Sequence, residues 1–70
     1  MYDLVGVDGN AFSVMGYVRK AMKEQKFSPE EIDVYQKDAM SSDYNHLLAV
    51  SVEAIDKCNE RCGEEVDNDD

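Results

Sequence analysis

The sequence predicts an all-α domain, specifically a compact three-helix bundle, from three observations. Three segments carry apolar residues at helical spacing, residues typical of helix N-caps precede each segment, and the connections between them are short. A chain of 70 residues suffices for one domain, which we expect to span residues 1–63. We expect residues 64–70, which carry five carboxylates and little apolar surface, to form a disordered acidic tail.

The first element, residues 2–8, is short, contains two valines and is interrupted by Gly6. These features predict a short strand or an extended arm. A lone strand needs a partner, so this segment would pair with another copy or with another protein.

The first helix begins after Asp8 or Asn10, either of which can act as its N-cap. Its apolar residues span an arc of about 200°, roughly twice the width that one-sided packing requires. Gly16 lies within this helix, where glycine lowers helix stability by about 1 kcal/mol relative to alanine. Two features would explain a glycine here: the close approach of another helix, or a ligand that lies against the backbone. We therefore expect a homo-oligomer, with contacts from Phe12, Val14, Gly16, Tyr17 and Ala21.

The second helix has the strongest local pattern in the chain. Ser28 is the predicted N-cap, Pro29 takes the first helical position, and Glu31 completes a capping box. Phe27 can form a hydrophobic staple with Ile32. The inward positions of this helix are Ile32, Tyr35 and Ala39, with Met40 at the margin.

The third helix is predicted to run from Tyr44 to Arg61, with capping residues at 41–43 and Gly63 as its C-terminal stop. Its apolar face comprises Tyr44, Leu47, Leu48, Ser51, Ala54, Ile55 and Cys58.

The net charge of −9 argues against direct nucleic-acid binding and against binding to an anionic membrane surface. No apolar run approaches the roughly 20 residues of a membrane span, and the N-terminus lacks the pattern of a signal peptide. We therefore expect a cytoplasmic protein.

The charges are unevenly distributed. Residues 19–26 hold four of the seven basic residues and one acidic residue. This pattern is explained by complementation of the helix dipole, or by a patch that binds a phosphate-bearing ligand or an acidic surface of a second copy. The partner-binding candidates here are Arg19, Lys20 and Lys23.

The third helix has an acidic side formed by Glu53, Asp56 and Glu60, where Lys57 can pair with Glu53. This side is either a solvated face or a partner-binding surface. Together with acids of the second helix (Glu30, Asp33 and Asp38), it could imitate a nucleic-acid backbone. Outside the tail, however, 11 carboxylates face seven bases, and this modest excess favours ordinary protein–protein binding.

Nothing in the sequence predicts catalysis, a metal or a cofactor. Cys58 and Cys62 lie four residues apart, too strained a spacing for a disulfide within one helix, and His46 is too distant to complete a zinc site. No base is predicted beside Ser13. We therefore expect a protein that is not an enzyme.

Two stretches resemble short proteins encoded by bacteriophage and prophage genomes: Leu4–Phe12 continuing through Met15-Gly16-Tyr17, and Ser28–Ile32 followed by Asp43–Leu48. The resemblance covers about residues 4–50 and excludes the acidic tail. It implies a mobile genetic element within a bacterial host cell, and it transfers no catalytic residue.

Small acidic proteins in that context are often inhibitors, so we expect an accessory protein that binds and inhibits a host protein, a defence system or a nucleic-acid enzyme. The alternative is an oligomeric module that binds a nucleotide or another phosphate compound through Arg19 and Lys23, with Phe12 or Tyr17 nearby.

Overall fold

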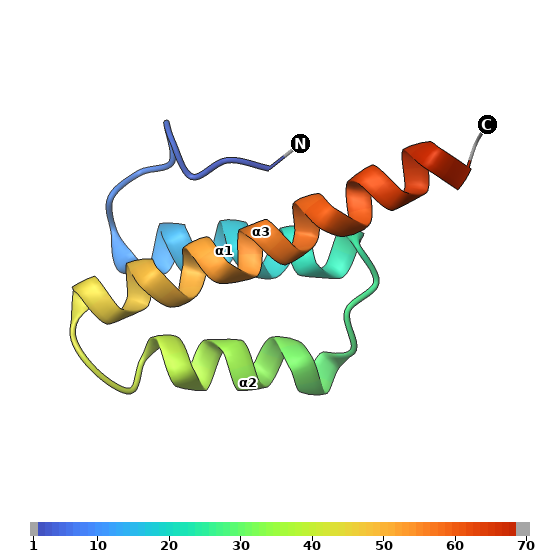
Figure 1. Cartoon of the computed structure of the whole chain (residues 1–70). Helices are drawn as coiled ribbons and strands as arrows, with labels where there is room; N and C mark the ends of the chain where they lie inside the picture. Colours follow the sequence, from blue (N-terminus) through green and yellow to red (C-terminus); the bar gives the residue numbers. More distant parts are fainter. Residues whose placement is uncertain (1, 69–70) are drawn as a thin grey trace.

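The computed structural model describes the backbone of residues 2–68 and the side chains of residues 2–61. It contains α1 (Ala11–Glu24), α2 (Pro29–Ala39) and α3 (Tyr44–Asn68), joined by short connections (Figure 1). The predicted three-helix bundle is therefore confirmed. α1 and α3 run in the same direction and α2 runs opposite to both.

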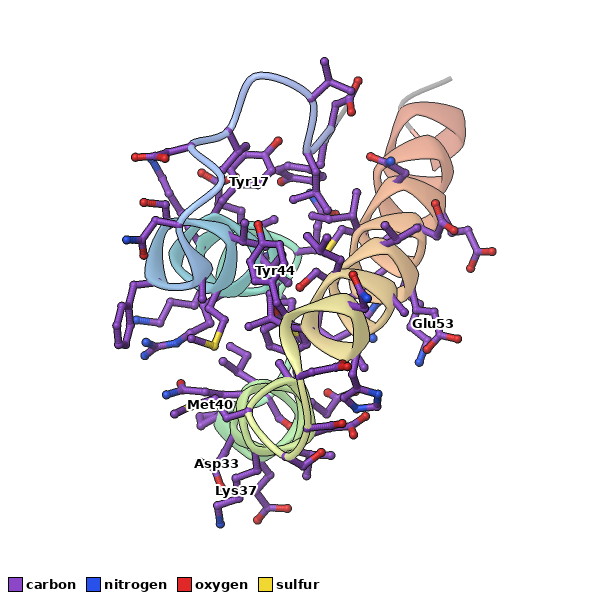
Figure 2. The ribbon with its side chains drawn as sticks, turned by 90° about the vertical axis from the view of Figure 1, so that its left-hand side faces the viewer. Tyr17, Asp33, Lys37, Met40, Tyr44 and Glu53 are labelled. Carbon is purple, nitrogen blue, oxygen red and sulfur yellow. The ribbon has the colours of Figure 1, made fainter. Side chains whose placement is uncertain are left out.

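Seen nearly along the helices, the three axes lie at the corners of a triangle, with every pair of helices in contact (Figure 2). The core fills the centre of this triangle. α1 contributes the largest share, and the core is completed by the inward faces of α2 and α3. Its buried apolar residues are Val14, Met15, Val18, Ala21, Met22, Ile32, Tyr35, Ala39, Leu47, Ala54, Ile55 and Cys58.

The helices begin at residues that satisfy their free N–H groups. Asn10 caps α1 by accepting from the Phe12 N–H at 2.8 Å, and the Asp43 carboxylate accepts from the His46 N–H at 3.0 Å. Ser28 and Glu31 form the predicted capping box, with reciprocal bonds of 3.1 and 3.0 Å. Because its carboxylate accepts from the Ser28 N–H, the pKa of Glu31 is lowered.

The end of α1 is a Schellman motif built on a lysine. The Phe27 N–H donates to the Met22 carbonyl at 2.9 Å, and the Lys26 N–H donates to the Lys23 carbonyl at 3.0 Å. Lys26 adopts a φ of 63°, a left-handed conformation in which glycine is usual. The chain thereby reverses, and half-buried Phe27 packs against the core where α2 begins.

The N-terminal segment forms no strand within residues 2–10, so the strand alternative is wrong; the segment is an arm, but one interrupted by a turn and not extended throughout. Leu4–Val7 make a turn in which the Val7 N–H donates to the Leu4 carbonyl at 3.1 Å. Gly6 takes a φ of 89° at its third position, which glycine adopts without strain. A turn within the segment breaks the extended backbone that a strand would need.

The arm packs on its own chain. The Asn59 side chain forms two hydrogen bonds with the Tyr2 backbone, at 2.7 and 3.0 Å, and the Asp3 N–H donates to the Tyr17 hydroxyl at 2.9 Å. Leu4 and Val7 pack against the core. The arm therefore covers the α1–α3 side of the triangle (Figure 2).

α3 continues through Gly63 to Asn68, so the predicted helix end at Gly63 is wrong. A glycine weakens a helix by about 1 kcal/mol but ends it only where a left-handed cap forms. Where we expected a disordered tail from residue 64, the backbone is helical through Asn68. Residues 69–70, and all side chains beyond Arg61, lie outside the described part of the chain.

Candidate protein-binding groove

A pair of buried hydroxyl groups joins α2 to α3. The Tyr35 and Ser51 hydroxyl oxygens lie 2.7 Å apart, and both residues are buried. Burial raises the pKa of Tyr35, so its phenol is neutral at physiological pH and can donate to Ser51. This hydrogen bond fixes the spacing of the two helices beneath their shared outer surface.

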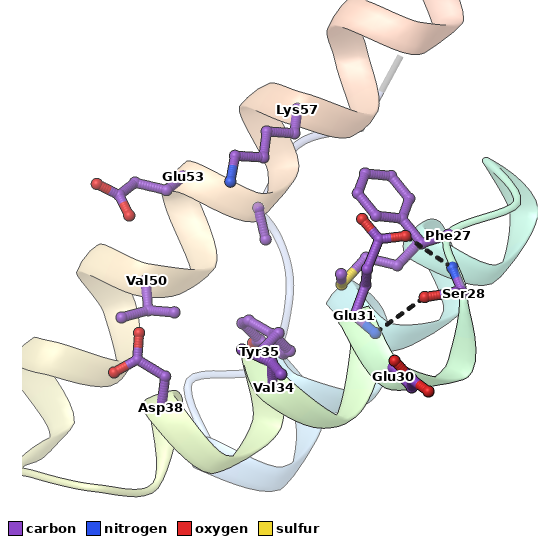
Figure 3. Close-up of a pocket in the computed structure, with 12 residues that line it drawn as sticks. Phe27, Ser28, Glu30, Glu31, Val34, Tyr35, Asp38, Val50, Glu53 and Lys57 are labelled. Carbon is purple, nitrogen blue, oxygen red and sulfur yellow. Dashed lines mark hydrogen bonds between the residues drawn. The ribbon is translucent and has the colours of Figure 1, made fainter.

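Above that bond lies an open groove between α2 and α3, with a volume of about 430 Å³ (Figure 3). Its apolar lining consists of Met22, Phe27, Val34, Tyr35, Val50 and Ala54. Val34 is 66% exposed although it stands on a wall of the groove. The bundle therefore leaves apolar surface uncovered here.

Carboxylates surround this apolar lining. Four acids border the groove, against the single cation Lys57: Glu30, Glu31, Asp38 and Glu53. The ion pair predicted between Lys57 and Glu53 does not form, and Figure 3 shows the two side chains apart. Among the described side chains, the ion pairs are Lys37–Asp33 and His46–Asp38, each at 3.0 Å. Glu30 and Glu53 are thus left without a cationic partner within the described chain.

The structure divides the predicted acidic surface. Glu53 borders the groove together with Glu30 and Asp38, whereas Asp56 and Glu60 are exposed and do not line it. The remaining predicted acid of α2, Asp33, lies at the other open side of that helix and pairs with Lys37.

The predicted basic residues lie elsewhere. Arg19 and Lys23 border a smaller hollow of about 290 Å³ between α1 and α2, together with Phe27 and Asp33. Lys20 is exposed and does not line this hollow. Neither of the aromatic residues proposed to join Arg19 and Lys23, Phe12 and Tyr17, lines it either.

The residues predicted as oligomer contacts have different environments. Val14 and Ala21 are buried in the core of the single chain, and Tyr17 is half-buried beside the arm. Phe12 is 76% exposed. In the part of the chain that the structure describes, no atom outside the surrounding helix segment lies within 4 Å of the position that a Cβ on Gly16 would occupy, so the close helix approach expected at Gly16 does not occur there.

One residue that lines the groove, Val34, and one contact of a lining residue, between Arg61 and Phe27, were missed from the sequence. Val34 falls outside the inward-facing apolar stripe of α2. A single apolar residue at an exposed position forms no periodic pattern from which a binding surface could be predicted. Arg61 donates to the Gln25 carbonyl at 2.9 Å, and its guanidinium lies 3.7 Å from the centre of the Phe27 ring. Such a contact between distant segments leaves no trace in local spacing.

Cys58 and His46, considered from the sequence as metal ligands, have different environments. Cys58 is a buried free thiol whose pKa is raised by burial, and the side chain of Cys62 lies outside the described residues. Among the described residues, no group of three potential metal ligands occurs. His46 bonds Asp38 at 3.0 Å on the exposed surface.

The fold and this groove define a small helical domain that presents an open, acid-bordered apolar surface. No described helix is long and apolar enough to cross a membrane. Comparison of the chain with protein-family models, curated proteins and solved structures gave no match.

Proposed function

We propose that this chain is a non-enzymatic protein-binding module that binds a basic region of a partner protein and inhibits it. The observation that carries the proposal is the α2–α3 groove, where apolar surface is exposed between carboxylates, of which Glu30 and Glu53 have no cationic partner within the described chain. Apolar contact provides binding free energy, while the acidic border attracts and orients a basic partner.

The overall charge supports the same partner class. A chain with a net charge of −9 attracts a basic protein over distances comparable to the Debye length, about 8 Å at physiological ionic strength. As part of the same proposal, the partner is a host bacterial protein and the location is the host cytoplasm, which is what a resemblance of residues 4–50 to bacteriophage and prophage proteins would imply. An oligomer joined through exposed residues such as Phe12 remains part of the proposal.

The test compares partner capture by two forms of the full-length chain. Tagged wild-type protein should retain a specific host protein from bacterial lysate and reduce the activity of that protein once purified. Replacement of Glu53, Asp56 and Glu60 by lysine should abolish both effects. Retention of the same protein by the charge-reversed form would contradict the proposal.

A second candidate function is favoured by the hollow between α1 and α2. Arg19 and Lys23 border the same hollow beside the Phe27 ring, an arrangement that can bind a phosphate and stack a base. In this case nucleotides should raise the melting temperature, and Arg19→Glu should remove that effect. An unchanged melting temperature in the presence of nucleotides would exclude this candidate.

A further inference from the structure

The three sides of the helical triangle are unequally covered. The N-terminal arm fills the α1–α3 side, where Leu4 and Val7 pack against the core and Asn59 holds the Tyr2 backbone. The other two sides, between α1 and α2 and between α2 and α3, each keep an open hollow. The bundle thus accepts an added segment on one side and keeps open hollows on the other two, of which the α2–α3 groove, at about 430 Å³, is larger than the α1–α2 hollow, at about 290 Å³.

We infer that the α2–α3 groove binds a short amphipathic helix whose apolar residues are flanked by lysine or arginine. This inference rests on the proposed function and specifies the chemistry of the partner at the same site. The apolar side of the added helix would cover Val34 and Val50, and its basic flanks would face Glu30, Asp38 and Glu53. The added helix would act as the fourth helix of a bundle.

The dimensions of the groove suit two turns of helix. Along α2 it extends from Glu30 to Asp38, which corresponds to about 12 Å at 1.5 Å per residue. Apolar residues at positions i, i+4 and i+7 of a partner helix would lie along this length.

The walls favour a helix over an extended peptide. Both walls are α-helices whose backbone groups are hydrogen-bonded within each helix, so they provide no edge for β-pairing. An extended peptide would bring its own backbone N–H and C=O groups onto apolar surface without partners. A helix satisfies these groups internally.

The charge distribution favours a foreign basic helix over a second copy of this chain. The cations of α1 that a second copy could offer at the groove belong to a molecule with a net charge of −9, whose excess of carboxylates opposes its binding at this acidic border. A basic helix from another protein is attracted both by the carboxylates that border the groove and by the net negative charge of the whole chain.

The probe is a synthetic helical peptide with leucines on one face and lysines on both flanks. Two controls accompany it: a peptide of the same composition with its leucines dispersed around the helix, and one with glutamate in place of lysine. Nuclear magnetic resonance of the labelled full-length chain should show shifts in residues 30–38 and 50–57. Both control peptides should bind at least about tenfold more weakly.

Matched variants separate the groove from the rest of the surface. Val34→Glu should weaken peptide binding at least about tenfold, whereas Val52→Glu, at a 50% exposed position of α3 outside the groove, should not. Glu53→Lys should likewise weaken binding more than Asp56→Lys, which makes the same change of net charge away from the groove. All four substituted side chains are exposed, so we expect each variant to fold.

Several results would overturn the inference. The first is that resonance shifts are confined to α1 or to the outer face of α3, and the second is that the peptide with dispersed leucines binds equally well. The third is that Glu53→Lys and Asp56→Lys weaken binding equally. The fourth is that groove resonances shift with protein concentration in the absence of peptide, which would assign the groove to a second copy. Peptide binding in the groove without capture of a host protein would contradict the proposed function alone. Capture that depends on Asp56 and Glu60 but not on Val34 would contradict this inference alone.

Discussion

The buried hydroxyl groups of Tyr35 and Ser51, 2.7 Å apart, form the polar contact on which the α2–α3 groove is built. Ser51 lies within the apolar stripe of α3, where a hydroxyl group is tolerated because Tyr35 provides a partner. The bond couples the position of α2 to that of α3, and hence the width of the surface to which we assign partner binding.

Removal of either hydroxyl should destabilise the fold. Tyr35→Phe and Ser51→Ala should each lower the free energy of unfolding by about 1–2 kcal/mol, because each leaves the other hydroxyl buried without a partner. The double variant should lose less than the sum of the two single losses, as measured by urea denaturation. Strict additivity would show that the two groups do not interact in solution.

Lys26→Gly should stabilise the protein. Because Lys26 adopts a φ of 63° at the end of α1, glycine would relieve a conformational cost of about 1 kcal/mol. Lys20→Gly, which removes the same charge from the exposed middle of the same helix, should instead destabilise by about 1 kcal/mol. Thermal and urea unfolding provide the comparison, and a loss of stability in Lys26→Gly would contradict the assigned turn.

Gly16→Ala tests the exposed side of α1. Within the described residues nothing obstructs a Cβ at this position, so the substitution should raise the free energy of unfolding by about 0.5–1 kcal/mol through helix propensity alone. Sedimentation of the same variant shows whether this glycine also contributes to self-association. Weaker self-association in Gly16→Ala than in the wild type would indicate that another copy approaches here.

Asn59→Ala should release the N-terminal arm. The substitution removes both hydrogen bonds to the Tyr2 backbone and should cost about 1–2 kcal/mol. The Asp3 amide, which donates to Tyr17, should then exchange its hydrogen faster. Asn45→Ala, at an exposed position of the same helix, is the control and should leave exchange at Asp3 unchanged.

The His46–Asp38 contact should make stability depend on pH. The hydrogen bond to Asp38 raises the pKa of His46 in the folded protein above the value of about 6.5 of an unperturbed histidine. The folded state therefore binds this proton more tightly, and the resulting stabilisation is complete below pH 6.5 and is lost as pH rises through the folded pKa.

This chain contains one histidine, so its titration can be followed directly by nuclear magnetic resonance. The midpoint should lie above 6.5 and should fall in Asp38→Asn. The stability advantage of the wild type over that variant should shrink as pH rises from 6 to 8. A histidine midpoint that is the same in both proteins would rule out the contact in solution.

Local patterns in the sequence determined the helices and their starting points. Ser28, Pro29 and Glu31 specify the beginning of α2 by bonds within four residues, and the inward stripe of Ile32, Tyr35 and Ala39 follows from helical spacing. Such features depend on residues that are close together in the sequence, so they can be predicted from the sequence alone. The end of α3 did not follow in this way, because a glycine such as Gly63 ends a helix only in a particular conformation.

Contacts between distant segments were decided by the tertiary structure alone. The sequence showed that the apolar arc of α1 is too wide for one-sided packing, but not that the arm covers part of it through Asn59, 57 residues from Tyr2. Likewise Glu53 and Val34 became parts of one groove only when α2 and α3 packed together around Tyr35 and Ser51. Helical periodicity assigns each residue to a face of its own helix, whereas the surface that a partner meets depends on which two faces adjoin.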